Sequence, residues 1–312
     1  MAKYLAITGG VGGAKLALGL SKLLSAEEIF FAVNTGDDLE YSGLYIAPDI
    51  DTLTYTLAGI NNPETGWGQA NDTWRVMENL QLLEGDTWFK LGDQDLALNL
   101  RRTQLIKQGY SLSESTEKIC AALKISHKII PMSNNPVRTL VQTDDGMLSF
   151  QDYFVRKGYQ PEVRQIHFEG ASTANLNPLI KQQLDEPSKL DGIIICPSNP
   201  YVSIDPLLSI QGAREILMQS KVPIVAVSPI VDGDAIKGPT AKIMKELGIT
   251  PSASSIAQHY GELLSGFVLD HKDLEISNSI KTTTMTANTV MLTLDDKVAL
   301  ARKVISFLAS LR

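Results

Sequence analysis

The sequence has little cysteine, little histidine and no long hydrophobic run. Its 312 residues include 2 cysteines, Cys120 and Cys196, and 4 histidines. Two thiols in apolar surroundings argue against a disulfide framework and predict buried free thiols, so we expect a cytoplasmic protein. The histidines, at positions 127, 167, 259 and 271, lack the spacing of zinc ligands and are interpreted as surface or core residues. No apolar run approaches the roughly 18 residues of a membrane span, so we expect no membrane partner.

Basic residues are outnumbered by acidic ones. The 28 Lys and Arg against 35 Asp and Glu give a formal net charge of −7. Duplex binding depends largely on neutralising phosphates, so this balance argues against a nucleic-acid partner. A small phosphorylated ligand stays compatible with it, because helix dipoles and a metal ion can offset the global charge locally. The sequence also lacks a G-x-S-x-G elbow, which argues against a serine hydrolase.

Five short apolar runs, each followed by Gly, Pro, Asn, Ser or Asp, predict buried strands. Helical patterns lie between them, and this alternation predicts an α/β fold with a Rossmann-like, doubly wound, mostly parallel sheet. In such sheets, ligands bind outside the carboxyl ends of the strands. The predicted strands are residues 4–8, 29–33, 192–196, 223–227 and 266–269, with helices that include 14–24 and 205–219.

The middle of the chain has a different pattern. Helical periodicity dominates residues 61–165, and only two short strand-like runs follow it. We therefore expect a nucleotide-binding core made of residues 1–60 and 166–312. Residues 61–165 are expected to form a helix-rich insertion over the sheet edge, as a lid or substrate subdomain. Its predicted helices are 74–83, 93–108 and 113–123, and its predicted strands are 125–130 and 138–143.

A glycine-rich loop separates the first strand from the first helix. Gly9, Gly10, Gly12 and Gly13 would let the backbone approach an anion, and the helix N-terminus adds free N–H groups. Lys15, in the first turn, is placed to reach a phosphate. The loop matches neither the Walker A motif nor G-x-G-x-x-G. We predict phosphate or nucleotide contact; the alternative is a tight turn that needs glycine for packing alone.

Four carboxylates, Asp37, Asp38, Asp49 and Asp51, lie close together in sequence on what the pattern predicts to be one loop after strand 29–33. Clustered carboxylates repel one another unless a cation or hydrogen-bond donors hold them. Mg²⁺ prefers such oxygens beside phosphates. The sequence therefore predicts a magnesium site, and a solvated acidic loop is the alternative.

Three further positions carry polar groups near predicted strand or helix ends. Ser198 and Asn199 follow a buried strand and can bind a nucleotide, or they serve only an Asx or proline turn. Lys237 is a second candidate for phosphate contact. Asp93 opens a predicted helix, where a carboxylate is favoured as an N-cap.

Together these segments resemble the CofD family, the 2-phospho-L-lactate transferases of coenzyme F420 biosynthesis. The PDID and PSNP segments are the specific part of this likeness, which runs nearly from end to end. The matching segments are 7–15 (ITGGVGGAK), 34–38 (NTGDD), 48–52 (PDIDT), 66–68 (GWG), 88–93 (WFKLGD), 150–154 (FQDYF), 197–200 (PSNP), 228–230 (SPI), 238–242 (GPTAK) and 259–260 (HY).

The resemblance implies transfer of a phosphorylated three-carbon acid, of the phospholactate or phosphoenolpyruvate type. The donor would be linked to guanosine diphosphate, and the acceptor would be the ribityl hydroxyl of the deazaflavin Fo. Products would be F420-0 or dehydro-F420-0 and GMP, with Mg²⁺ as cofactor. We also expect a homodimer, formed through an exposed apolar helix.

On this basis each candidate residue has an expected role. Asp38, Asp49 and Asp51 would hold Mg²⁺, and Asp51 would also orient and deprotonate the Fo hydroxyl. We expect the fold to tolerate Asp51→Asn. The residues expected at the nucleotide are Gly9, Gly10, Gly12, Gly13, Lys15, Ser198, Asn199 and Lys237, and those expected at Fo are Asn34, Asp51, Trp67, Trp88 and Asp93.

The main alternative is a non-catalytic regulator that binds a nucleotide or sugar nucleotide through the same glycine loop. An oxidoreductase on a Rossmann-like sheet is disfavoured by the broken dinucleotide fingerprint. The chain departs from the family pattern at Gln94, Asn99, Asn134 and Asn135. The identity of the three-carbon acid stays open.

Overall fold

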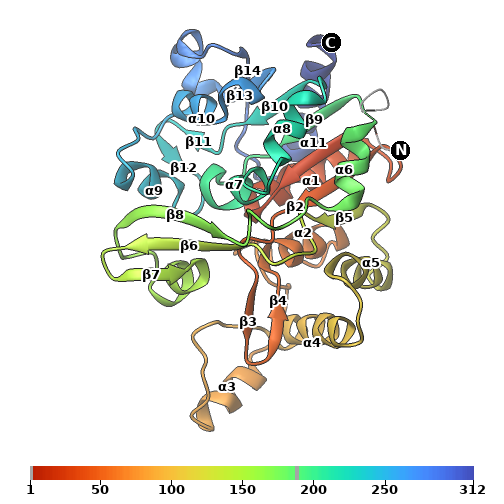
Figure 1. The fold of residues 1–312 in the computed structure, drawn as a ribbon, viewed down its shortest axis with the longest axis vertical. Helices are drawn as coiled ribbons and strands as arrows, with labels where there is room; N and C mark the ends of the chain where they lie inside the picture. The colour runs from red at the N-terminus through yellow and green to blue at the C-terminus, as the bar shows by residue number, and fades with distance from the viewer. Residues whose placement is uncertain (1–2, 187–189) are drawn as a thin grey trace.

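A computed structural model describes residues 3–186 and 190–312 (Figure 1). In this part of the chain a seven-stranded sheet has the order β14-β13-β10-β9-β1-β2-β5, and every neighbouring pair is parallel. The direction of strand succession reverses between β1 and β9, which creates the switch point at which such sheets bind ligands. The strands are β1 (Tyr4–Thr8), β2 (Ile29–Val33), β5 (Lys128–Pro131), β9 (Gly192–Ile195), β10 (Ile224–Val227), β13 (Gly266–Asp270) and β14 (Thr283–Ala287).

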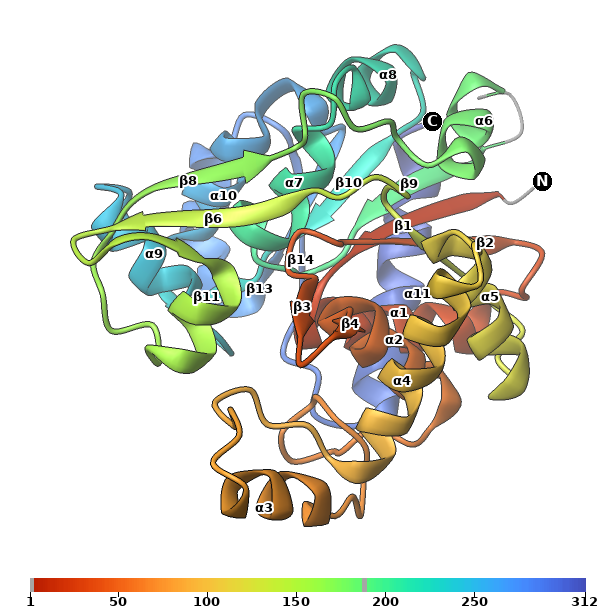
Figure 2. The same cartoon turned by 60° about the horizontal axis from the view of Figure 1, so that its bottom comes forward.

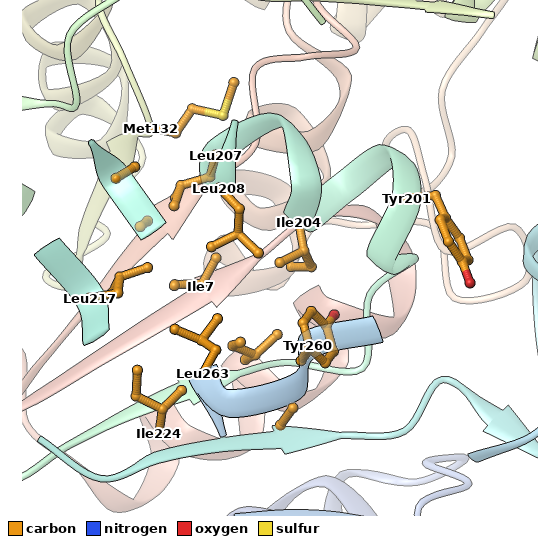
Figure 3. Close-up of a cluster of buried hydrophobic side chains, with 14 of the residues drawn as sticks. Ile7, Met132, Tyr201, Ile204, Leu207, Leu208, Leu217, Ile224, Tyr260 and Leu263 are labelled. Carbon is orange, nitrogen blue, oxygen red and sulfur yellow. The ribbon is translucent and has the colours of Figure 1, made fainter. Parts of the chain in front are cut away.

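Helices cover both faces of this sheet because the side chains of each strand alternate between two cores. In β1, Leu5 and Ile7 join the core that includes side chains of α6, α7, α8 and α10, part of which is drawn in Figure 3. Tyr4 and Ala6 join the core beneath α1, α2 and α11. The doubly wound α/β prediction is therefore confirmed. The covering helices are α1 (Gly10–Leu23), α2 (Pro48–Ala58), α6 (Pro178–Asp185), α7 (Asp205–Leu208), α8 (Ala213–Gln219), α10 (Ala253–Tyr260) and α11 (Leu294–Ser310).

Smaller elements extend beyond the sheet, and both views show α3 far from it (Figures 1 and 2). Strands β6, β7 and β8 form an antiparallel sheet, and two hairpins pair β3 with β4 and β11 with β12. These elements are β3 (Leu39–Tyr41), β4 (Leu44–Ile46), α3 (Arg75–Leu82), α4 (Asp93–Lys107), α5 (Leu112–Ala122), β6 (Arg138–Thr143), β7 (Gly146–Ser149), η1 (Asp152–Arg156), β8 (Val163–Glu169), η3 (Pro200–Ile204), β11 (Ile230–Val231), β12 (Asp234–Ala235), α9 (Thr240–Glu246), η4 (Gly261–Leu263) and η5 (His271–Ser279).

Several predicted elements differ from the structure. The predicted helix 205–219 is two helices, separated near Gly212, whose φ of 77° lies in the left-handed region. The predicted acidic loop contains the β3–β4 hairpin and the start of α2 at Pro48, a proline typical of a first helical turn. Strand β5 lies inside the predicted insertion 61–165, yet it pairs with β2 of the main sheet. The division of the chain into a core and an insertion stays a prediction. No helix among the described residues is long and apolar enough to cross a membrane.

Candidate functional site

The glycine loop joins β1 directly to α1, which begins at Gly10 rather than at the predicted residue 14. The N–H of Gly9 donates to Ser198 Oγ at 3.1 Å, and the N–H of Gly10 donates to Asp49 Oδ1 at 2.7 Å. The loop therefore meets the turn after β9 on one side and the first turn of α2 on the other. Three separate segments converge at the switch point, as the strand-end argument predicted.

Close packing explains why this loop needs glycine. A Cβ on Gly12 would overlap the carbonyl oxygen of Pro197, and a Cβ on Gly13 would overlap Thr8 Oγ1 and Ser198 Oγ. Gly10 has a φ of 64°, which favours glycine. Close packing is therefore a sufficient reason for these glycines, whether or not the loop also binds an anion. The anion-binding prediction stays a prediction, since the N–H groups of Gly9 and Gly10 already donate to Ser198 and Asp49.

Two lysines lie beside the first turns of α1. Lys15 Nζ donates to the carbonyl of Met291 at 3.0 Å, and Lys237 Nζ donates to the carbonyl of Thr65 at 2.9 Å. Burial, and then the positive charge of Lys237, lower the pKa of Lys15. Two cations held near each other at a helix N-terminus form an arrangement that an anion stabilises.

Asn34, at the end of β2, organises two of the four carboxylates. Its Nδ2 donates to Asp49 Oδ2 at 2.9 Å and to Asp37 Oδ1 at 3.2 Å. Burial raises the pKa of Asp49 to about 6, although the hydrogen bonds from Asn34 and Gly10 oppose the shift. Burial and the charge of Asp49 also raise the pKa of Asp37. Asp49, which touches both Asn34 and the glycine loop, is the acid closest to the predicted phosphate site.

Asp51 instead pairs with a residue that we did not predict. Its two carboxylate oxygens accept hydrogen bonds from Arg102 on α4, and both side chains are buried. Arg102 also donates to Asn99 Oδ1 at 2.5 Å, and Asn99 Nδ2 donates to the carbonyl of Asp95 at 3.0 Å. Tyr55 donates to the Asp95 carboxylate and completes a buried polar row between α2 and α4. Burial opposes the charge on Arg102, but Asp51 outweighs it and raises the pKa of Arg102.

Asp38 lies in a third environment. Its Oδ2 accepts from the hydroxyl of Tyr45 at 2.8 Å, while Oδ1 is buried and has no hydrogen-bond partner among the described residues. Burial raises the pKa of Asp38 to about 7, although the nearby guanidinium of Arg138 on β6 opposes the shift. A buried carboxylate oxygen without a donor is a place where a cation or a ligand hydroxyl fits.

The structure does not bring Asp38, Asp49 and Asp51 together as one set of ligands. Across residues 3–186 and 190–312, no group of three Asp, Glu, His or Cys side chains could hold a metal ion. Asp51 suits a metal least, because its charge is already paired with Arg102. Asp38 and Asp49 remain suitable, since Mg²⁺ is commonly held by one or two carboxylates together with substrate phosphates.

The two tryptophans expected at Fo have different surroundings. Trp67 is 48% exposed and lines a small cleft with Trp74, Asp72 and Asp95. Trp88 is half-buried, and its ring packs edge-on against Tyr41 with centroids 5.5 Å apart. Trp67 therefore presents its ring to solvent beside a cleft, whereas Trp88 mainly supports the β3–β4 hairpin.

Asp93, the first residue of α4, caps α3, and Asp72, in the turn before α3, caps α4. The Asp93 carboxylate accepts hydrogen bonds from the N–H groups of Arg75 and Val76 at 3.2 and 3.0 Å, at the start of α3. Asp72 accepts from the N–H of Gln94 at 2.9 Å, at the start of α4. The capping interpretation of Asp93 is correct, but the helix that it caps is α3 rather than its own.

Most of the residues at which the chain departs from the family pattern make hydrogen bonds only to nearby helix ends or turns. Gln94 is exposed, and its side chain donates to the carbonyl of Asn71 at 3.4 Å. Asn134 Oδ1 accepts from the N–H of Ser113 at 3.0 Å, near the start of α5. Asn99 alone belongs to the site, because it links Arg102 to Asp95.

Sequence reasoning missed Arg102, Arg138 and a pair formed by His259 and Asp205. His259 Nε2 donates to Asp205 Oδ1 at 2.9 Å across 54 positions of sequence. No spacing rule could have found this pair. For Arg102, the signal was a cation placed one and two helical turns after Asn99 and Asp95 on the same helix face.

Comparisons with known proteins show which proteins this chain is similar to. A family model described as 2-phospho-L-lactate transferase CofD matches residues 5–309. The chain is similar to the 2-phospho-L-lactate transferase of Methanocaldococcus jannaschii, at 38% identity over 309 residues and 98% of both chains. It is also similar to a phosphoenolpyruvate transferase of Streptomyces griseus, at 34% identity over 99% of both chains. A crystal structure of a UPF0052-family protein from Bacillus halodurans covers 99% of both chains with a TM-score of 0.61 at 15% identity, which supports the fold alone.

Proposed function

The chain belongs to the CofD family of 2-phospho-L-lactate transferases, and from that premise we propose that it transfers a phosphorylated three-carbon acid to the deazaflavin Fo. The acid is of the phospholactate or phosphoenolpyruvate type and comes from a guanosine diphosphate-linked donor. The ribityl hydroxyl of Fo attacks the phosphorus that carries the acid, and the bond to the GMP phosphate breaks. The products are F420-0 or dehydro-F420-0 and GMP.

The observation that carries this proposal is the meeting of cations and acids at the switch point. Lys15 and Lys237 lie beside the N-terminus of α1, and Asp49 contacts Gly10 at its start. In this proposal the lysines and the glycine loop bind the diphosphate. Phosphoryl-type transfer depends mainly on positioning and charge stabilisation, so these groups supply most of what the reaction needs.

We propose that Asp38 and Asp49 hold Mg²⁺ beside the diphosphate. The buried, unpaired Oδ1 of Asp38 supports this assignment, because no described donor already holds it. When bound, the ion would neutralise charge on the donor phosphates. The contribution of the protein is to keep two carboxylates within reach of the glycine loop.

Asp51 is the proposed acceptor of the hydroxyl proton of Fo. Its pair with Arg102 fixes the orientation of the carboxylate. Each oxygen of an ionised carboxylate has two lone pairs, so a hydroxyl can donate to Asp51 while Arg102 stays bound. Asn34 and Trp67 are also proposed to contact Fo.

The cellular setting is part of the proposal. The free thiols Cys120 and Cys196 are both buried, which suits a reducing cytoplasm.

The apolar side chains Val76, Leu82 and Leu83, at and just after α3, are 50%, 81% and 79% exposed. This surface supports the proposal of a homodimer.

Fo fluorescence separates this function from a nucleotide-binding regulator. The purified protein would be incubated with Fo, Mg²⁺ and each candidate donor, and the fluorescent species would be separated by charge. A transferase converts Fo into a more anionic fluorescent product. If Fo stays unmodified with every donor, and its fluorescence shows no binding, the transferase proposal is wrong.

A further inference from the structure

The small antiparallel sheet, β6–β7–β8, holds the loop that follows β2. Three successive carbonyls of this loop accept hydrogen bonds from donors on β6 or just after β7. The bonds run from Arg138 Nη1 to the Thr35 carbonyl at 3.3 Å, from the Thr139 N–H to the Gly36 carbonyl at 2.8 Å and from Gln151 Nε2 to the Asp37 carbonyl at 3.2 Å. The main chain of residues 35–37 therefore takes its position from the small sheet as well as from β2.

The contact between this loop and β6 is close. A Cβ built on Gly36 would lie 2.6 Å from Thr139 Oγ1 and 2.9 Å from the side chain of Pro206. Figure 1 shows β6, β7 and β8 to one side of the main sheet, with which they share no strand pairing. Close-packed contacts transmit displacement, so a shift of the small sheet would move the loop with it.

Gln151 makes one of these bonds from a buried position. It is 5% exposed and lies between the end of β7 and η1. The turn around it is fixed, because Ser149 Oγ donates to Asp152 Oδ2 at 2.7 Å and accepts from the Asp152 N–H at 3.1 Å. Phe150, the residue before it, belongs to the hydrophobic core. The amide of Gln151 is therefore held firmly at the Asp37 carbonyl, and the function proposed above gives this residue no task.

The two carboxylates proposed to share a cation have different supports. Asp38 directly follows the carbonyl that Gln151 holds, and its buried Oδ1 has no hydrogen-bond partner among the described residues. Asp49 lies in the first turn of α2 and accepts from the Gly10 N–H and from Asn34. The separation of the two carboxylates therefore depends on how the small sheet packs against the rest of the protein. Mg²⁺ demands near-ideal octahedral geometry, with oxygens at about 2.0–2.1 Å, so a small displacement of one carboxylate weakens its binding.

We propose that Gln151 is a positioning residue of the transfer reaction. By fixing the main chain at Asp37, it holds Asp38 where this carboxylate and that of Asp49 can share Mg²⁺. This inference rests on the proposed function, which supplies the cation. The role is indirect, because Gln151 acts through the loop and not on a substrate. Hydrogen-bond partners that orient a metal-binding side chain typically change metal affinity or activity roughly 10- to 100-fold when they are removed.

The test measures metal binding separately from activity, with Mn²⁺ as the probe. Protein is dialysed to equilibrium with GDP at the same concentration on both sides, and the Mn²⁺ retained by the protein is measured. Gln151→Met keeps the length of the side chain and removes the donor. We expect its apparent Mn²⁺ affinity to fall roughly 10- to 100-fold. The Mg²⁺ concentration that half-activates turnover should rise by a similar factor, while the KM for Fo stays unchanged.

Three other variants serve as references. Asp38→Asn removes a proposed ligand and should lose most of the Mn²⁺ binding. Gln151→Asn keeps an amide but draws it back by one methylene, so we expect a smaller loss in the same direction, and it replaces Gln151→Met if that variant does not fold. Thr143→Val is the matched control, because Thr143 is buried at the other end of β6 and its Oγ1 donates to the Gly146 carbonyl at 2.9 Å. It should bind Mn²⁺ as wild type does.

Wild-type Mn²⁺ affinity in the folded Gln151 variants would overturn the assignment, and urea midpoints show which variants are folded. An equal loss in Thr143→Val would also overturn it, because the effect would then come from the small sheet as a whole. Wild-type affinity in Asp38→Asn would overturn it as well. If the Gln151 variants lose Mn²⁺ affinity as expected but wild type never converts Fo, the proposed function fails and the role of Gln151 in metal binding stands.

Discussion

Asp51 on α2 and Arg102 on α4 form a buried pair in which each carboxylate oxygen accepts a hydrogen bond from the guanidinium. The pair joins α2, which packs beneath the main sheet, to α4. It gives Asp51 a structural task in addition to any chemical one. The expectation that the fold tolerates Asp51→Asn is therefore revised.

Asp51→Asn should destabilise the protein, because it leaves the charge of Arg102 buried without a counter-charge. We expect the free energy of unfolding to fall by about 3–5 kcal/mol, measured by urea denaturation. The double variant Asp51→Leu with Arg102→Met removes both charges and should recover most of that loss. A single variant with the wild-type urea midpoint would show that the pair contributes little.

Asp49→Asn should abolish most turnover while the fold persists. It removes a negative charge beside the glycine loop and the proposed metal, and we expect kcat to fall by roughly 10²- to 10⁴-fold. Asp37→Asn is the matched control, since Asp37 shares Asn34 but makes no contact with Gly10 in the structure. We expect Asp37→Asn to retain far more activity. Equal losses in the two variants would remove the distinction between these acids.

Asp95 should make stability depend on pH. Burial, and then the charge of Asp51, raise the pKa of Asp95 to about 7 from an ordinary value of 3.8. The folded state therefore binds a proton that the unfolded state releases, so its stabilising contribution is complete below about pH 4 and is lost as pH rises to about 7. Asp95→Asn should make the decline in unfolding free energy between pH 4 and 7 shallower. An unchanged slope in denaturation series across this range would contradict the raised pKa.

Removal of divalent metal should stop turnover without unfolding the protein. Asp38 and Asp49 belong to separate hydrogen-bonded environments that protein donors already support. We expect EDTA to abolish conversion of Fo, Mg²⁺ to restore it, and the melting temperature to change little. Full activity in EDTA after exhaustive dialysis would exclude Mg²⁺ as a cofactor.

Sequence patterns predicted those parts of the candidate site whose residues lie at or just beyond the carboxyl ends of the parallel strands. Gly9 and Asn34 come directly after parallel strands and Ser198 lies three residues beyond a third, so their meeting follows from the topology. The start of α2 was missed although Pro48 and the acids after it are typical of a first helical turn. Strand β14 was not predicted, because it is partly exposed at the sheet edge and its TTMTA sequence has no continuous apolar run.

The partners of the acids could not be predicted from sequence. Arg102 follows Arg101 in a helix rich in polar residues, and only the fold shows that one guanidinium is buried and the other exposed. His259 and Asp205 meet because α10 packs near the turn after β9. Pairings of this kind depend on how helices pack on the sheet, which local patterns do not encode.

The most direct test of the central claim measures both products of one reaction. Purified protein would be incubated with Fo, Mg²⁺ and guanosine diphosphate-linked phospholactate, phosphoenolpyruvate or phosphoglycerate donors, and products would be identified by mass. The account predicts a phosphodiester of Fo and the three-carbon acid, formed in the same amount as GMP, with at least one donor. Release of GMP without a modified Fo, or no reaction with any donor, would contradict it.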